Sequence, residues 1–186
     1  MKRKSIILWI ICLVLVDQGT KLIVANFFID TSFYIIKPIF GFRPIFNTQF
    51  SYFNSLLKLN LGLLYHTIVL ILIQLFILFV IDYYKTRQRS NNTLLDISYI
   101  FGQSALICVF CGFYLWGAGI LDFIDLFFWT VDLKDIYLNC FVIFFIINEF
   151  KYLKERKNSN IKMKNYLSNH WAKFKQGYKN MKSKID

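Results

Sequence analysis

Carboxylate side chains gather in one short stretch of this sequence, where Asp122, Asp125, Asp132 and Asp135 follow one another closely. Asp122 and Asp125 are three positions apart, so we predict that they are neighbours on one face at the end of a helix. Two close carboxylates in a site of low dielectric constant cannot both ionise cheaply, so one retains a proton. Such a pair suits general acid–base activation of water. The competing interpretation is that these acids are simply solvated where a helix gives way to a loop.

A second group of ionisable residues lies in the apolar N-terminal segment. Asp17 and Lys21 are four positions apart, so on a helix they share a face and can neutralise each other. Ionisable groups inside a membrane span usually point into the interior of a helix bundle or a polar cavity. The pair therefore predicts a polar site between helices rather than a plain membrane anchor.

The composition identifies the elements that must position these groups. The chain has 186 residues, 56% of them hydrophobic, and a mean hydropathy of +0.46. These values are typical of a membrane protein, in which one span needs about 20 mostly apolar residues. We predict an all-α membrane protein whose membrane domain occupies residues 1–150, with spans at about 5–28, 60–84, 94–121 and 136–150.

Positive charges predict the orientation of these spans. They cluster before the first span, in the loop 85–93 and after residue 150, and short basic flanks stay in the cytoplasm. We therefore expect both termini inside, and the segments at about 30–59 and 122–135 outside. A cleaved secretory signal is the alternative for the N-terminus, but an uncleaved anchor is favoured because a small-residue cleavage site is missing.

The first outer segment mixes aromatic and β-branched residues with two prolines. This pattern favours a short twisted β-sheet on the membrane surface, followed by a half-helix at about 55–59. An aromatic belt on an ordinary loop is the alternative. His66 is expected to be an interfacial or hydrogen-bonded histidine rather than a ligand. The four cysteines all fall in apolar spans, which favours helix-packing residues over a metal site.

Residues 151–186 form a strongly basic tail with 11 basic and 2 acidic residues. Trp171 and Phe174 belong to an apolar series with helical spacing, and Lys173 and Lys175 belong to the opposite face. The pattern predicts a cytoplasmic amphipathic helix that binds an anionic membrane surface or a partner protein. Nucleic acid also attracts such charge, but a tail tethered beside a bilayer favours lipid, and we expect no nucleic-acid partner.

The order of these features resembles the lipoprotein signal peptidases, the signal peptidase II family. The resemblance covers about residues 5–150 and is strongest at VDQGTK (16–21) and VDLKD (131–135), the latter similar to the family's VDFID. Asn47-Thr48 is similar to the start of the family's NxGxAF segment, and Leu138-Asn139 to its FN.

This resemblance implies an aspartic peptidase of the bacterial cytoplasmic (inner) membrane. In the family, two aspartates on spans three and four cut prolipoproteins just before the lipid-modified cysteine, while an outer sheet and a half-helix hold the substrate. The expected partners are therefore membrane lipids and a lipoprotein or lipid substrate, and no cofactor is expected. The resemblance assigns Asp17, Lys21, Asn47 and Asn139 to a substrate cavity.

The resemblance also predicts an incomplete catalytic pair. The family's GNxxDR corresponds to residues 121–126, which retain Asp125, and its FNxAD corresponds to residues 138–142, which carry Val142 at the position of the second aspartate. In one hypothesis Asp122, Asp132 or Asp135 replaces that missing partner of Asp125 in a divergent peptidase. The other is a non-catalytic pseudo-peptidase that acts as a subunit or scaffold of a larger membrane complex. A small transporter or channel subunit is a third option.

Overall fold

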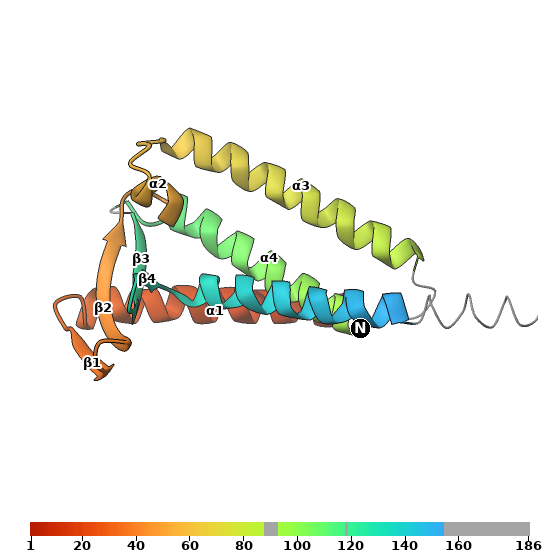
Figure 1. Cartoon of the computed structure of the whole chain (residues 1–186), viewed down its shortest axis with the longest axis horizontal. Coiled ribbons are helices and arrows are strands. Elements are labelled where there is room, and N and C mark those ends of the chain that lie inside the picture. Colours follow the sequence, from red (N-terminus) through yellow and green to blue (C-terminus); the bar gives the residue numbers. More distant parts are fainter. Residues whose placement is uncertain (88–92, 118, 155–186) are drawn as a thin grey trace, which may run out of the picture. The chain divides into compact units, whose positions relative to one another are not determined.

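The computed structural model describes residues 1–87, 93–117 and 119–154 (Figure 1). The predicted amphipathic helix and its residues Trp171, Lys173, Phe174 and Lys175 lie outside the described residues. Residues 1–145 form one compact unit, and residues 146–186 belong to a second. The predicted domain boundary at residue 150 stays a prediction.

Four described helices are long and apolar enough to cross a membrane, as predicted. They are α1 (Arg3–Phe27), α3 (Leu63–Arg87), α4 (Thr93–Tyr114) and a last helix, Leu133–Lys154 (Figure 1). The chain is thus a mostly helical, multi-pass membrane protein. Its last span begins at Leu133, ahead of the predicted residue 136.

The predicted extent of the third span is wrong, because α4 ends at Tyr114 rather than continuing to about residue 121. Gly119 follows with a φ of 111°, a left-handed conformation that glycine adopts without steric cost. A Cβ atom there would meet the backbone oxygen of Asn47 at 2.8 Å. The glycine therefore lets the chain leave α4 and enter a strand directly beside Asn47.

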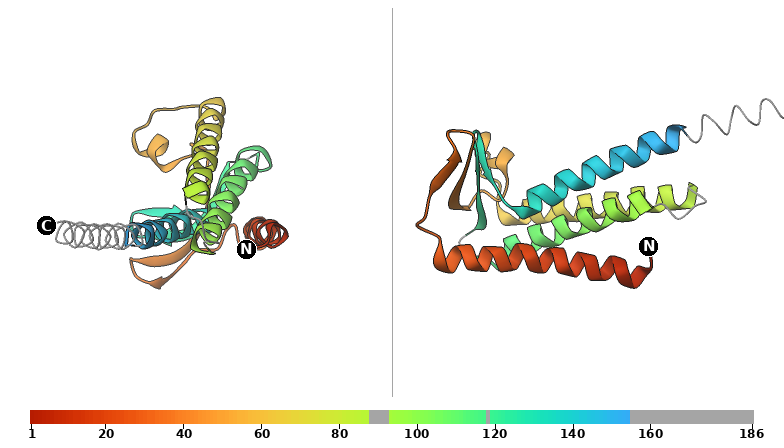
Figure 2. Two further views of the ribbon diagram at one scale, coloured as in Figure 1. Left: turned by 90° about the vertical axis from the view of Figure 1, so that its right-hand side faces the viewer. Right: turned by 90° about the horizontal axis from the view of Figure 1, so that it is seen from below.

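The strands form one antiparallel sheet in the order β1-β2-β3-β4. They are β1 (Phe33–Ile36), β2 (Phe40–Asn47), β3 (Ile120–Leu126) and β4 (Trp129–Val131). The sheet predicted in the first outer segment is present, but half of it comes from residues 120–131. In Figure 2 (right), the sheet lies at the end of α1 that is remote from the N-terminus.

A short helix, α2 (Tyr52–Leu56), follows β2 and starts earlier than the half-helix expected at about 55–59. Buried Asn54 holds the chain around it. Its side-chain amide donates to the carbonyl oxygens of Gln49 at 2.7 Å and Leu61 at 3.1 Å, and its Oδ1 accepts from the backbone N–H of Leu61 at 3.0 Å. One side chain thus closes the connection from β2 to α3.

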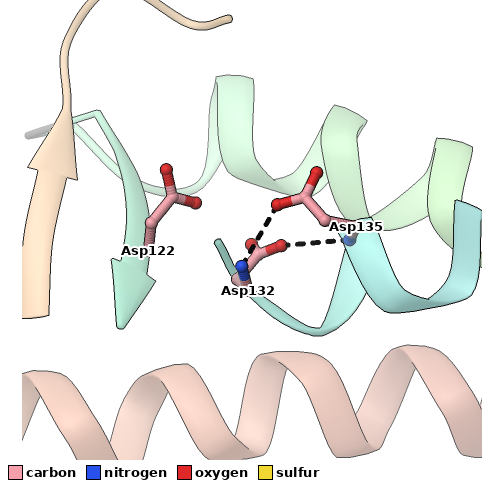
Figure 3. Close-up of side chains that lie close together, drawn as sticks. All are labelled: Asp122, Asp132 and Asp135. Atoms are coloured by element: carbon pink, nitrogen blue, oxygen red, sulfur yellow. Dashed lines mark hydrogen bonds between the residues drawn. The ribbon is translucent and has the colours of Figure 1, made fainter. Parts of the chain in front are cut away.

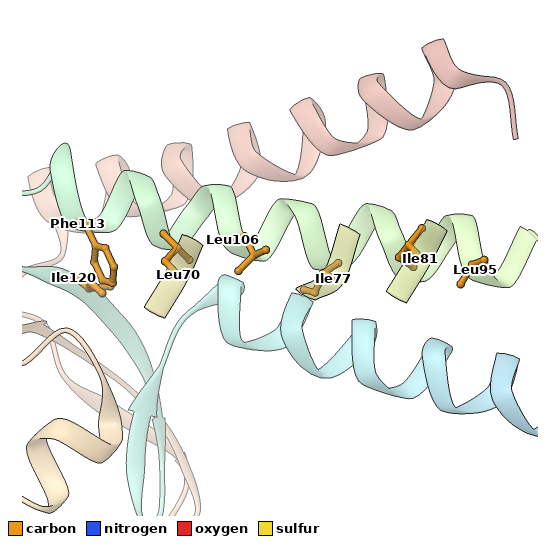
Figure 4. Close-up of a cluster of buried hydrophobic side chains, with 7 residues drawn as sticks. All are labelled: Leu70, Ile77, Ile81, Leu95, Leu106, Phe113 and Ile120. Atoms are coloured by element: carbon orange, nitrogen blue, oxygen red, sulfur yellow. The ribbon is translucent and has the colours of Figure 1, made fainter. Parts of the chain in front are cut away.

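An apolar core joins α3, α4 and the start of β3 (Figure 4). Its buried members are Leu70, Ile77, Ile81, Leu95, Leu106, Phe113 and Ile120. Within this interface the side-chain amide of Gln74 donates to Oε1 of Gln103 at 3.0 Å. At the far end of α4, Asp96 pairs with the α-amino group of Met1 and, at 3.4 Å, with Lys85. These contacts bring the N-terminus and the end of α3 together, away from the sheet.

Candidate active site

Three carboxylates converge where the sheet meets the last helix (Figure 3). Asp122 comes from β3, Asp132 directly follows β4, and Asp135 lies in the first turn of the last helix. The β3–β4 hairpin returns the chain to this point, since Ile124 pairs with Val131. One carboxylate oxygen from each of the three residues lies within 4.8 Å of the others.

Asp132 and Asp135 also explain why the last helix begins here. The backbone N–H of Asp132 donates to Oδ2 of Asp135 at 3.1 Å, and that of Asp135 donates to Oδ1 of Asp132 at 3.4 Å. This reciprocal pattern is that of a capping box, with a second acid in place of the usual Glu or Gln. Carboxylates are also favoured at a helix N-terminus by the helix dipole. Local sequence therefore fixes the direction of both side chains.

Lys134 supplies a positive charge to all three acids. Its Nζ lies 3.1 Å from Asp122 Oδ1, 2.8 Å from Asp132 Oδ1 and 3.2 Å from Asp135 Oδ2, and only 11% of its side chain is exposed. The three carboxylates thus share one ammonium group.

The predicted pairing of Asp17 with Lys21 is present, and it extends this cluster. Lys21 Nζ lies 3.1 Å from Asp17 Oδ2 and 2.6 Å from Asp132 Oδ2, and all three side chains are fully buried. Gln18 donates to Asp17 Oδ2 at 2.7 Å, and the indole N–H of Trp116 donates to Gln18 Oε1 at 3.0 Å. Helix α1 therefore contributes one acid and one base to the polar interior. The role of Asp17 and Lys21 in a substrate cavity stays a prediction.

Burial and neighbouring charges shift the pKa values of Asp122 and Asp132 in opposite directions. Burial raises the pKa of Asp122 to about 6, an effect that Lys134 opposes and Asp132 reinforces. Burial also disfavours ionisation of Asp132, but Lys134 and Lys21 outweigh it and hold the pKa of Asp132 below its ordinary value. Asp132 is thus the permanently charged member of the group. Asp122 can change its protonation state near neutral pH.

Asp125 lies elsewhere on the sheet. It accepts hydrogen bonds from Arg43 Nη2 at 3.0 Å and Thr130 Oγ1 at 3.4 Å. The prediction that Asp122 and Asp125 share a helix face is wrong, because both belong to β3. Residues three apart on a strand point to opposite faces of the sheet. Asp125 therefore contacts Arg43 rather than the acid cluster.

Three further positions were taken from the family motifs: Val142, Asn139 and Asn47. Val142 is 43% exposed on the last helix. Asn139 is exposed and donates to the backbone oxygen of Asp135 at 2.9 Å. Asn47 ends β2, pairs with Ile120 and accepts from the backbone N–H of Gln49 at 3.0 Å.

Two residues of the site region escaped the sequence interpretation. Lys134 was given no role in the sequence analysis, although its position between Asp132 and Asp135 in a capping pattern was a usable signal. Asn54 gave no signal at all. His66 has the expected hydrogen-bonded setting, since its ring nitrogens lie 3.2 Å from Ser51 Oγ and 3.0 Å from the backbone oxygen of Gly62. All four cysteines are free thiols.

A buried aspartate cluster between a small sheet and bilayer-length helices defines a membrane protein with an interior acidic site. The family described as signal peptidase (SPase) II matches residues 9–151, and the chain belongs to this family. The fold is similar to a bacterial membrane enzyme solved by the in meso method at 1.9 Å, with a TM-score of 0.64 and 22% identity over 80% of this chain and 94% of that one. A second such structure, at 2.3 Å, gives a TM-score of 0.60 and 21% identity over 80% and 89% of the respective chains. No curated protein matches the chain significantly.

Proposed function

We propose that this protein is a lipoprotein signal peptidase whose catalytic pair is Asp122 and Asp135. The observation that carries the proposal is the convergence of these two carboxylates, buried Asp122 from β3 and partly exposed Asp135 from the last helix. The family supplies the reaction class, cleavage of prolipoproteins. The local geometry supplies two acids close enough to act on one water molecule.

This assignment differs from the alignment given in the sequence analysis, in which Asp125 and position 142 are the two catalytic positions. The family's FNxAD spacing also fits Val131–Asp135, with Asp132 in place of Asn and Lys134 in place of Ala. On this alignment the second aspartate is retained as Asp135. Two facts favour it: Asp135 belongs to the acid cluster, whereas Asp125 is held by Arg43.

The arrangement suits hydrolysis of a peptide bond. Asp135 orients a water molecule, and ionised Asp122 takes a proton from that water as its oxygen attacks the scissile carbonyl carbon. The proton then passes from Asp122 to the leaving nitrogen as the C–N bond breaks. The products are a new carboxyl end on the signal peptide and a free amine on the lipoprotein, so all atoms and charges balance.

The proposed setting is the bacterial cytoplasmic membrane, with the sheet on the outer side and both termini inside. Met1 and Lys85 both contact Asp96 at the end of α4 remote from the sheet, so the N-terminus and the end of α3 lie on the same side, which supports an inner position for both. Membrane lipids and a lipid-modified precursor are the proposed partners. A protein partner for the basic tail stays a prediction.

The non-catalytic alternative rests on one observation, that Lys134 already contacts all three acids. An ammonium group in that position could mark a binding or scaffold protein in which no water is activated. A transporter or channel subunit, in contrast, gains no support from a cluster this tightly paired.

A cleavage assay distinguishes the peptidase from the non-catalytic protein. The purified full-length protein is incubated with a diacylglyceryl-modified prolipoprotein. We expect turnover by the wild type, and a loss of about 10²-fold or more in Asp122→Asn and in Asp135→Asn. Asp125→Asn and Val142→Asp are the matched controls and should leave turnover within a few-fold of wild type. An inert wild type that gains turnover in Val142→Asp would refute the proposed pair and favour the pseudo-peptidase.

A further inference from the structure

Lys134 occupies a position that is electrostatically unfavourable for a positive charge. It is the second residue of the last helix, and the helix dipole makes a helix N-terminus unfavourable for a cation. Its Nζ nevertheless lies nearly buried, 3.1 Å from Asp122 and 3.2 Å from Asp135. The carboxylates on either side must outweigh both the dipole and the loss of hydration.

The ammonium group bridges the two acids of the proposed catalytic pair. Two carboxylates at such a separation ordinarily share one proton, since both cannot ionise without a compensating charge. A cation between them removes that requirement. Lys134 therefore does by its charge what a shared proton does in an aspartate pair that lacks a lysine.

We propose that Lys134 is a positioning residue for the proposed cleavage, whose ammonium group replaces the proton that Asp122 and Asp135 would otherwise share. Asp122 is then ionised at neutral pH without a proton on Asp135 being required, and it is free to accept a proton from water. This inference rests on the proposed function and deepens it.

The surroundings of Lys134 agree with this role. Asp122 faces it from β3, and Asp132 and Asp135 face it from its own stretch of chain. Helix α1 adds Asp17 and Lys21, and the charges of both residues also interact electrostatically with the thiol of Cys108 in α4. When ionised, the four aspartates of this cluster outnumber its two lysines. Removing Lys134 would therefore leave a strongly negative site, and a proton would be taken up in its place.

The test compares Lys134→Met and Lys134→Arg with the wild type, using Lys37→Met as a control because Lys37 is exposed on the first hairpin. The first readout is kcat/KM for the prolipoprotein as a function of pH. We expect the acid side of the profile to move to higher pH in Lys134→Met by about 1 to 3 units, the usual effect of an adjacent opposite charge. Lys134→Arg should keep most of the wild-type profile, and Lys37→Met all of it.

The second readout needs no turnover. The carbonyl stretch of protonated carboxylic acids, followed by infrared spectroscopy on the full-length protein, should show a protonated aspartate at pH 7 in Lys134→Met and none in the wild type. The signal should disappear in Lys134→Met/Asp122→Asn.

Unchanged profiles and unchanged carboxyl titration in Lys134→Met, with only a lower melting temperature, would overturn the inference and leave Lys134 a structural residue. An inert wild type would refute the proposed function instead. The infrared titration would then still decide whether Lys134 keeps the acids ionised.

Discussion

The ammonium group of Lys21 lies 2.6 Å from Asp132 Oδ2, and neither side chain is exposed. Lys21 belongs to α1, whereas Asp132 caps the last helix. The contact therefore ties the first span to the start of the fourth. Because Asp132 also contacts Lys134, the same ion pair supports the acid cluster.

Replacing Lys21 by Met should destabilise the protein severely. Removing one partner of a buried ion pair leaves an uncompensated charge and costs about 3–5 kcal/mol. Here buried Asp17 loses Lys21, while Asp132 keeps Lys134. Thermal unfolding in mild detergent measures the effect. Lys21→Met/Asp17→Asn should recover part of the loss, while exposed Lys37→Met should stay within about 0.5 kcal/mol of wild type. A Lys21→Met protein as stable as the wild type would refute the structural role of this contact.

The pH dependence of cleavage should report Asp122. Burial raises the pKa of this acid to about 6, and the proposed mechanism requires its ionised form. We therefore expect kcat/KM to be level above this pH and to fall about tenfold per unit below it. Measurement between pH 4.5 and 8 with one prolipoprotein checks this. A rate that rises as the pH falls would show instead that a protonated Asp122 is needed.

Asp122 should also lower the stability of the protein, because its carboxyl group is buried. Its pKa is raised from 3.8 to about 6, so between these values the folded state binds more protons than the unfolded state. Stability then falls as the pH rises through this window and is lowest above it. We expect Asp122→Asn to be more stable than wild type at pH 8 by about 1–3 kcal/mol, with the gain vanishing below the ordinary pKa. Chemical unfolding at pH 8 and pH 4 tests the sign, and a variant that is less stable at both would contradict it.

Hydropathy predicted the helices of this protein because each span must be apolar over most of its length, and it placed the Asp17–Lys21 pair correctly. The secondary structure of residues 120–126 was harder to predict. Their apolar run with acids at 122 and 125 fits a helix end as well as a strand, and periodicity alone cannot separate the two in so short a segment. The partner strand β2 lies far away in sequence, so only long-range pairing decides.

Gly119 should be required for the entry into β3. Its φ of 111° is one that other residues rarely adopt, and a Cβ would lie 2.8 Å from the backbone oxygen of Asn47. We expect Gly119→Ala to lose about 1–3 kcal/mol from backbone strain alone, and to lower turnover because β3 carries Asp122. Gly19→Ala is the matched control. Gly19 lies in α1 with open space around it, so alanine should be neutral or stabilising there. Equal melting temperatures for the two variants would contradict the requirement.

Asn54 should determine whether the connection between β2 and α3 is ordered. Its side chain, 2% exposed, bonds to Gln49 and Leu61 on either side of α2. Asn54→Ala leaves those backbone groups without their partner, at a cost of about 1–3 kcal/mol. Because the loss is local, we expect faster hydrogen exchange and easier proteolysis in residues 48–62 with little change in the helices. Asn26→Ala is the comparison, since Asn26 bonds only to Leu22 of its own helix. Uniformly faster exchange across the protein would mean instead that Asn54 supports the whole fold.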